Sequence, residues 1–138
     1  MKKLVTRADF QAMAGARLRE AGALLAAGEW SGAYYLAGYA LELGLKSLVI
    51  KKLMATDAFP DQKLIQNSYT HSLKVLVGTA GLTADLDAAV PASPALSGGW
   101  RAAQEWSEQS RYYEWDEIEA REMMDAVKEV MAWIRTQW

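Results

Sequence analysis

The sequence contains no cysteine and only one histidine, His71. Without cysteine the chain forms no disulfide and no thiolate metal site, and it has no thiol nucleophile. A metal site could then draw only on carboxylates and His71, and no run of carboxylates has the spacing of a hard-cation loop. We therefore expect no bound metal and no cofactor. The lack of disulfides fits a cytoplasmic location.

The chain also lacks a large excess of positive or negative charge, and it lacks long apolar runs. The net charge is −2, from 15 basic and 17 acidic residues, so there is no general attraction to nucleic acid, and RNA binding would require a local basic patch. No run of about 20 residues is both apolar and uncharged. The two N-terminal lysines are not followed by the apolar core of a signal peptide. We expect no membrane segment and no leader.

Strand signals are absent, because apolar and polar residues never alternate for long and no Asn-Gly or Asp-Gly hairpin turn occurs. Helical spacing is frequent instead. The sequence predicts one domain, residues 1–138, folded as an all-α, up-and-down bundle of four or five helices. The predicted helices cover residues 7–27, 30–53, about 71–78, 83–91, 94–107 and 117–138.

Start and stop signals support these helices. Thr6 with Asp9, and Asp116 with Glu119, have the spacing of a capping box, and Gly28 is placed to end the first helix. Ser68 or Thr70 is the expected cap of the helix near His71, Thr83 caps the next, and Ser93-Pro94 opens another. Three features interrupt the pattern: a polar loop over 54–70, a weak point at Gly98-Gly99, and a connector over 107–115.

The stretch from Trp30 to Leu53 is apolar on almost every side, as expected for a helix surrounded by others. One stripe carries only small residues and allows a neighbouring helix to approach closely: Ala33, Ala37, Ala40 and Gly44. The opposite stripe is polar: Ser31, Tyr35, Tyr39, Glu42 and Lys46.

Glu42 and Lys46 stand at i and i+4 with the acid first, the favourable order for an ion pair within a helix. One interpretation places both groups at the rim of the bundle, in water. The other places them in a polar pocket or at a two-fold interface, together with Tyr35 and Tyr39. Arg17, on the apolar face of the first predicted helix, is the expected partner of Glu42.

Tryptophan is abundant, with six residues, and all but Trp30 lie between Trp100 and Trp138. This clustering predicts an aromatic core or a dimer interface in the second half of the chain.

The run GAYYLAGYALELGLK at residues 32–46 resembles the HEPN domain (higher eukaryotes and prokaryotes nucleotide-binding). The flanking segments add to the resemblance: LLAAGEW at the end of the first helix, THSL at 70–73, and SRYY at 110–113 before the last helix. The resemblance implies an all-α bundle that is commonly a homodimer. Many members are metal-independent RNases of toxin–antitoxin and defence systems, and some pair with a nucleotidyltransferase antitoxin.

The nuclease motif of that family is an arginine followed four to six residues later by a histidine. Arg111 matches the arginine, but residues 112–117 contain no histidine. A metal-free RNase needs a base for the 2′-hydroxyl, an acid for the leaving oxygen, and a cation for the negative charge of the phosphorane. His71 could supply the proton transfers if the fold brings it to Arg111; Tyr112, Tyr113, Glu114 and Asp116 are the side chains available after Arg111 instead.

Three hypotheses follow. The first is a dimeric nucleotide- or RNA-binding module in which Arg111 holds phosphate, a base stacks on Tyr35, Tyr39 or Tyr112, and Glu42 and Lys46 orient the groups. The second is an RNase toxin that uses Arg111 with His71. The third is a structural or partner-binding module in which Glu42, Arg17 and Arg111 form a buried ion-pair network.

Overall fold

The structure is a computed structural model that describes all 138 residues. It is entirely helical, so the all-α prediction is confirmed. The elements in chain order are α1 (Arg7–Ala26), α2 (Trp30–Thr56), α3 (Gln62–Ser68), α4 (Leu73–Thr79), α5 (Thr83–Ala92), α6 (Pro94–Ala103), the 3-10 helix η1 (Glu108–Tyr112) and α7 (Glu117–Gln137).

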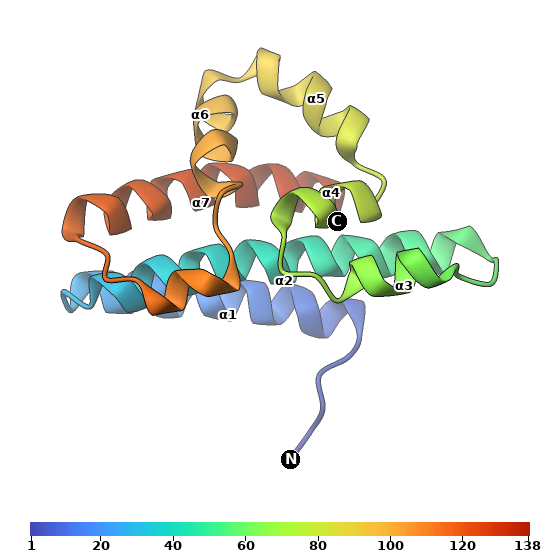
Figure 1. Cartoon of the computed structure of the whole chain (residues 1–138), viewed down its shortest axis with the longest axis horizontal. Helices are drawn as coiled ribbons and strands as arrows, with labels where there is room; N and C mark the ends of the chain where they lie inside the picture. The colour runs from blue at the N-terminus through green and yellow to red at the C-terminus, as the bar shows by residue number, and fades with distance from the viewer.

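Three long helices, α1, α2 and α7, run side by side, with α2 between the other two (Figure 1). The short helices α4, α5 and α6 form an arch on the far side from α1, and α6 returns the chain to α7. The molecule is therefore a helical bundle, as predicted, built from three long helices and several short ones.

The two predicted capping boxes are present. The Thr6 hydroxyl accepts from the backbone N–H of Asp9, whose carboxylate accepts from the N–H of Thr6. Asp116 and Glu119 make the same reciprocal pair at the start of α7. Gly28, at φ +77°, takes the left-handed conformation that ends α1 and turns the chain into α2.

The small stripe of α2 is buried, as expected, and it admits α7. A Cβ added to Gly44 would lie 3.3 Å from Ile134 and 3.4 Å from the sulfur of Met131. Close approach here lets the apolar face of α7 pack directly on α2, where Met131 and Ile134 are fully buried.

Two predicted interruptions and one predicted helix cap differ from the structure. The predicted loop over 54–70 contains α3, which is capped by Asp61. Ser72, rather than Ser68 or Thr70, caps α4. Gly98-Gly99 lies inside an unbroken α6, because a close contact with α7 offsets the low helix propensity of glycine: a Cβ on Gly99 would lie 3.0 Å from the carbonyl oxygen of Ala126.

The tryptophans pack within the chain itself. Trp106 is buried and the other five are half-buried. Trp106 is therefore part of the core, while a dimer interface formed by the partly exposed tryptophans stays a prediction.

No single helix is long and apolar enough to cross a membrane; α4 and α5 meet such a test only as a pair bent by 116°.

Candidate functional site

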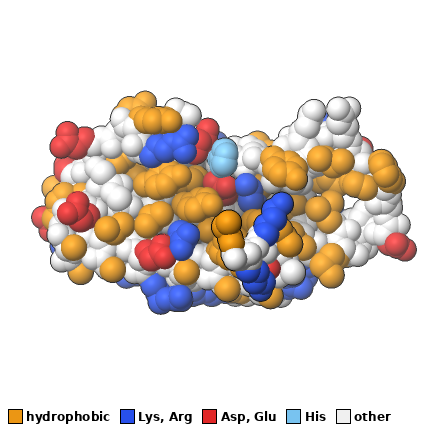
Figure 2. Space-filling view, turned by 90° about the horizontal axis from the view of Figure 1, so that it is seen from below, with side chains coloured by type: hydrophobic (Ala, Val, Ile, Leu, Met, Phe, Trp, Pro, Cys, Tyr) orange, Lys and Arg blue, Asp and Glu red, His pale blue; other side chains and the backbone are white.

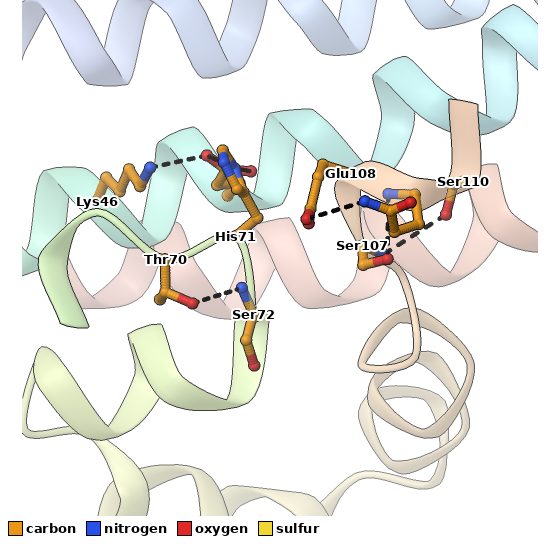
Figure 3. Close-up of polar contacts among 9 residues, drawn as sticks. Lys46, Thr70, His71, Ser72, Ser107, Glu108 and Ser110 are labelled. Atoms are coloured by element: carbon orange, nitrogen blue, oxygen red, sulfur yellow. Dashed lines mark hydrogen bonds and ion pairs between the residues drawn. The ribbon is translucent and has the colours of Figure 1, made fainter. Parts of the chain in front are cut away.

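Glu42 is the centre of the candidate site. It lies near the middle of α2, is only 2% exposed, and forms polar contacts with two side chains, those of Lys46 and His71. Its Oε1 accepts from Lys46 Nζ at 2.8 Å, and its Oε2 lies 3.0 Å from His71 Nδ1 (Figure 3). The interpretation that placed Glu42 in water is wrong, because an acid buried to this degree needs such partners.

The start of α4 brings His71 to this carboxylate. Leu73, Leu76 and Val77 of α4 are buried and α4 packs on α2, which fixes the preceding loop. The hydroxyl of Thr70 accepts from the backbone N–H of Ser72 at 3.1 Å and shapes the turn around His71. The contact between Glu42 and His71 joins residues 29 positions apart, so no local sequence pattern could predict it.

The contact with Glu42 fixes the chemical state of one ring nitrogen of His71. A carboxylate oxygen only accepts hydrogen bonds, so Nδ1 of His71 carries the hydrogen. The side chain is 47% exposed, which leaves the imidazole open to solvent on its other side. An imidazole oriented by a buried carboxylate in this way is suited to proton transfer through Nε2.

Arg111 lies on η1 and is exposed. Its guanidinium carbon is 5.0 Å from the centre of the Tyr112 ring. Hydrogen bonding to Tyr112, and after it the interaction with Tyr35, raises the pKa of Arg111 above its usual value. An arginine is always charged, and this guanidinium lies over the ring of Tyr112.

Glu108 connects these two groups and was not foreseen. Its own backbone N–H lowers the pKa of its carboxyl most, and the side chain of Gln109 and the nearby charges of His71 and Arg111 add to this effect. His71 and Arg111, which are separated by forty residues of sequence, thus both act on one carboxylate. Glu108 also lines a cavity of about 440 Å³ with His71.

Aromatic rings form a continuous wall next to the site. The rings of Tyr35 and Tyr39 stack with centres 6.1 Å apart, and Tyr35 lies 5.8 Å from Trp106. Burial, and then the charge of Glu42, raises the pKa of Tyr39. Of the predicted stacking residues, Tyr112 is the most open, at 70% exposed.

The structure thus brings the predicted site residues together in two adjoining groups, Glu42–Lys46–His71 and Arg111–Tyr112–Tyr35. It does not form the proposed buried network. Arg17 pairs with Glu20 on its own helix at 2.7 Å, and Arg111 is at the surface. Glu42 pairs with Lys46 of its own helix and with His71 from the turn before α4, and not with Arg17.

No group of three His, Asp or Glu side chains converges as metal ligands do. Comparisons with protein-family models, with curated proteins and with solved structures give no match for this chain.

Proposed function

We propose that this chain is a HEPN-like module that binds single-stranded RNA, or a nucleotide, at the surface made by Arg111, Tyr112, Tyr35 and His71, named here the His71–Arg111 face. The observation that carries the proposal is that a histidine oriented by a buried carboxylate lines a cavity with Glu108, and that the exposed Arg111 lies close enough to Glu108 to lower the pKa of its carboxyl, as His71 does. In Figure 2 the histidine is at the surface, with basic and apolar side chains close by.

Each part of this face suits a part of a nucleotide. The guanidinium of Arg111 matches the oxygens of a phosphate, in two parallel hydrogen bonds. The open ring of Tyr112 offers a stacking platform for an unpaired base. The carboxylate of Glu108 repels phosphate, but it accepts a hydrogen bond from a ribose 2′-hydroxyl, a group that DNA lacks.

A fluorescence-polarisation titration with a labelled short single-stranded RNA tests the proposal. Arg111→Ala should weaken binding by roughly 10-fold or more, in line with loss of a charge-assisted hydrogen bond. Arg121→Ala is the matched control, since Arg121 is also exposed and also lies over an aromatic ring, that of Trp30. Equal losses in the two variants, or no binding by the wild type at high concentration, would reject the proposal.

The Glu42–His71 contact favours a second candidate, metal-independent RNA cleavage. Nε2 of His71 would take the proton of the 2′-hydroxyl as the 2′-oxygen attacks phosphorus. As the bond from phosphorus to the 5′-oxygen breaks, the resulting imidazolium would give that proton to the leaving 5′-oxygen, which leaves a 2′,3′-cyclic phosphate and a free 5′-hydroxyl. Arg111 would stabilise the charge that develops on the phosphate oxygens. His71 here replaces the histidine that is missing after Arg111.

Cleavage of a mixed RNA pool in the presence of a chelator separates the two candidates. A binding module leaves the pool intact while it still binds. A nuclease degrades the pool, and His71→Gln abolishes cleavage while RNA binding through Arg111 and Tyr112 remains measurable.

A further inference from the structure

A second hollow lies between the N-terminal segment, α2 and α3, and it is distinct from the cavity beside His71. Its volume is about 520 Å³, which is within the range of small-molecule sites. Its apolar side chains include Phe10, Val49, Ile50, Leu53 and Ile65. Val49 is buried, whereas Leu53 and Ile65 are partly open to solvent, so the hollow is an apolar groove with an accessible mouth.

The helix α3 leaves this groove open because it does not pack into α2. It runs back along the end of α2 (Figure 1), but its main contacts are with α4, and none of its residues is buried. Ile65, in the middle of α3, lines the groove opposite the apolar residues of α2 and is 44% exposed. Apolar side chains thus stand on both sides of a space that no side chain of the protein fills.

The charge of the groove has one sign. None of the twelve residues that line it is acidic, while Lys3 and Lys46 are both among them. Lys3 makes no ion pair within the chain. Lys46 gives one of its three N–H donors to Glu42, at 2.8 Å, and keeps the others. The groove is therefore complementary to an anion with an apolar part, and not to a cation.

The polar and apolar parts of the groove lie toward opposite ends. Along α2, the lining residues run from Lys46 to Leu53, over which the helix rises by about 10 Å. Because α3 runs in the opposite direction, the polar residues Ser68 and Tyr69 at its end lie toward Lys46. Pro60, which precedes α3, lies toward Leu53. The groove thus has the polarity of an elongated amphiphile.

We propose that this groove binds one free medium-chain fatty acid, with its carboxylate at Lys46 and its tail between α2 and α3. The carboxylate accepts from Nζ of Lys46, and Lys3 supplies a second positive charge nearby. The tail covers the apolar side chains that the protein leaves open, along a length of about 10 Å. The inference concerns a surface other than the His71–Arg111 face and does not depend on RNA binding.

Lys46 would also connect this ligand to the candidate site. The same ammonium group that lines the groove donates to Glu42, and Glu42 holds Nδ1 of His71 at 3.0 Å. A carboxylate bound to Lys46 shares that ammonium with Glu42 and so changes the charge that His71 experiences. We therefore expect the fatty acid to be detected at His71, although it does not contact the imidazole.

Isothermal titration calorimetry of the full chain with decanoate, below its micelle concentration, tests the inference. One molecule should bind per chain. From hexanoate to decanoate, each added CH₂ group should strengthen binding by roughly 4-fold, because each is transferred from water to the apolar groove. Decyltrimethylammonium carries the same tail with the opposite charge, and it should bind roughly 10-fold more weakly or worse.

Two pairs of variants assign the binding to the groove. Ile65→Asp places a negative charge on the groove wall and should weaken decanoate binding by roughly 10-fold or more. Its control is Ile118→Asp, on α7, and both positions are exposed, so the fold should be kept, which circular dichroism checks. Lys3→Ala should weaken binding by roughly 2- to 5-fold, as for an exposed ion pair. Lys63→Ala changes the net charge equally, outside the groove, and should have no effect.

The inference is overturned if the wild type does not bind decanoate, or if many molecules adsorb to each chain. Equal affinity for decyltrimethylammonium, or equal losses in Ile65→Asp and Ile118→Asp, would also overturn it. A groove that a segment of another protein covers instead gives the first of these results. Proton–nitrogen NMR completes the test: decanoate should shift the imidazole signals of His71, and binding that leaves them unmoved would contradict the role of Lys46.

Discussion

Gly38 is the position at which the smallest change should have the largest structural effect. It lies on α2 against the indole of Trp106, which is 2% exposed. A Cβ at position 38 would stand 2.2 Å from Cδ1, 2.3 Å from Cγ and 2.4 Å from Nε1 of that ring, whereas ordinary contacts begin at 3.4 Å. Gly38→Ala therefore forces the indole to retreat by roughly 1 Å.

Movement of the indole is limited by the residues packed around it, among them Tyr35, whose ring centre is 5.8 Å from that of Trp106. Overpacking of this kind costs about 1–3 kcal/mol, and a rigid ring places the cost near the upper end. The higher helix propensity of alanine offsets up to about 1 kcal/mol of this cost in the free energy of unfolding. We expect a net loss of about 2 kcal/mol in the free energy of unfolding.

Urea unfolding followed by circular dichroism measures this loss. Gly22→Ala is the matched control, because Gly22 lies within α1 with nothing within 4 Å of its added Cβ, and the change should stabilise the protein. The Nε1 of Trp106 has no hydrogen-bond partner, so Trp106→Phe reduces the ring without breaking a bond and should lessen the effect of Gly38→Ala. If Gly38→Ala stabilises the protein as Gly22→Ala does, the packing described here is wrong.

Three further predictions concern other parts of the chain. Glu42→Gln leaves Lys46 without its carboxylate; because Lys46 is partly exposed, the loss should be about 1–3 kcal/mol, below that of a fully buried pair, and an unchanged urea midpoint would contradict it. The pKa of Asp9 is about 2, lowered from 3.8 by hydrogen bonds with Thr6, so its stabilising effect is complete above about pH 4 and is lost as the pH falls toward 2. In Asp9→Asn the melting temperature should therefore depend less on pH between about 4 and 2 than in the wild type. An equal pH dependence of the melting temperature in both proteins would refute the assignment. Gly99→Ala meets a backbone oxygen at 3.0 Å and should destabilise by about 1–2 kcal/mol, while Gly98→Ala, with open space around it, should not; the reverse order in thermal melts would argue against the packing of α6 on α7.

Local signals in the sequence were sufficient for most of the long helices. Capping boxes and the left-handed Gly28 depend on residues within a few positions of one another, so the ends of α1 and the start of α7 were predicted correctly. The unbroken α6 was not foreseen, because a tertiary contact of Gly99 with α7 overrides the local weakness of two glycines.

The candidate site was predicted in part. Glu42 and Lys46 share one helix, and their spacing alone indicated the ion pair that forms. The partner of Glu42 came from the turn before α4, and no pattern within the sequence could choose His71 over Arg17 for that role. Glu108 was missed because it stands in a stretch without helical periodicity, whose 3-10 conformation carries little signal.

The single histidine offers the most direct test of the account, because its imidazole signals are unique in the spectrum. Long-range proton–nitrogen NMR of the wild type, with and without a short single-stranded RNA, reports on both ring nitrogens of His71. We expect a protonated Nδ1 held by Glu42 in the free protein, and a clear shift of the Nε2 signal on addition of RNA, which Arg111→Ala diminishes. An Nε2 signal that does not move at saturating RNA would contradict the claim that the His71–Arg111 face is the binding site.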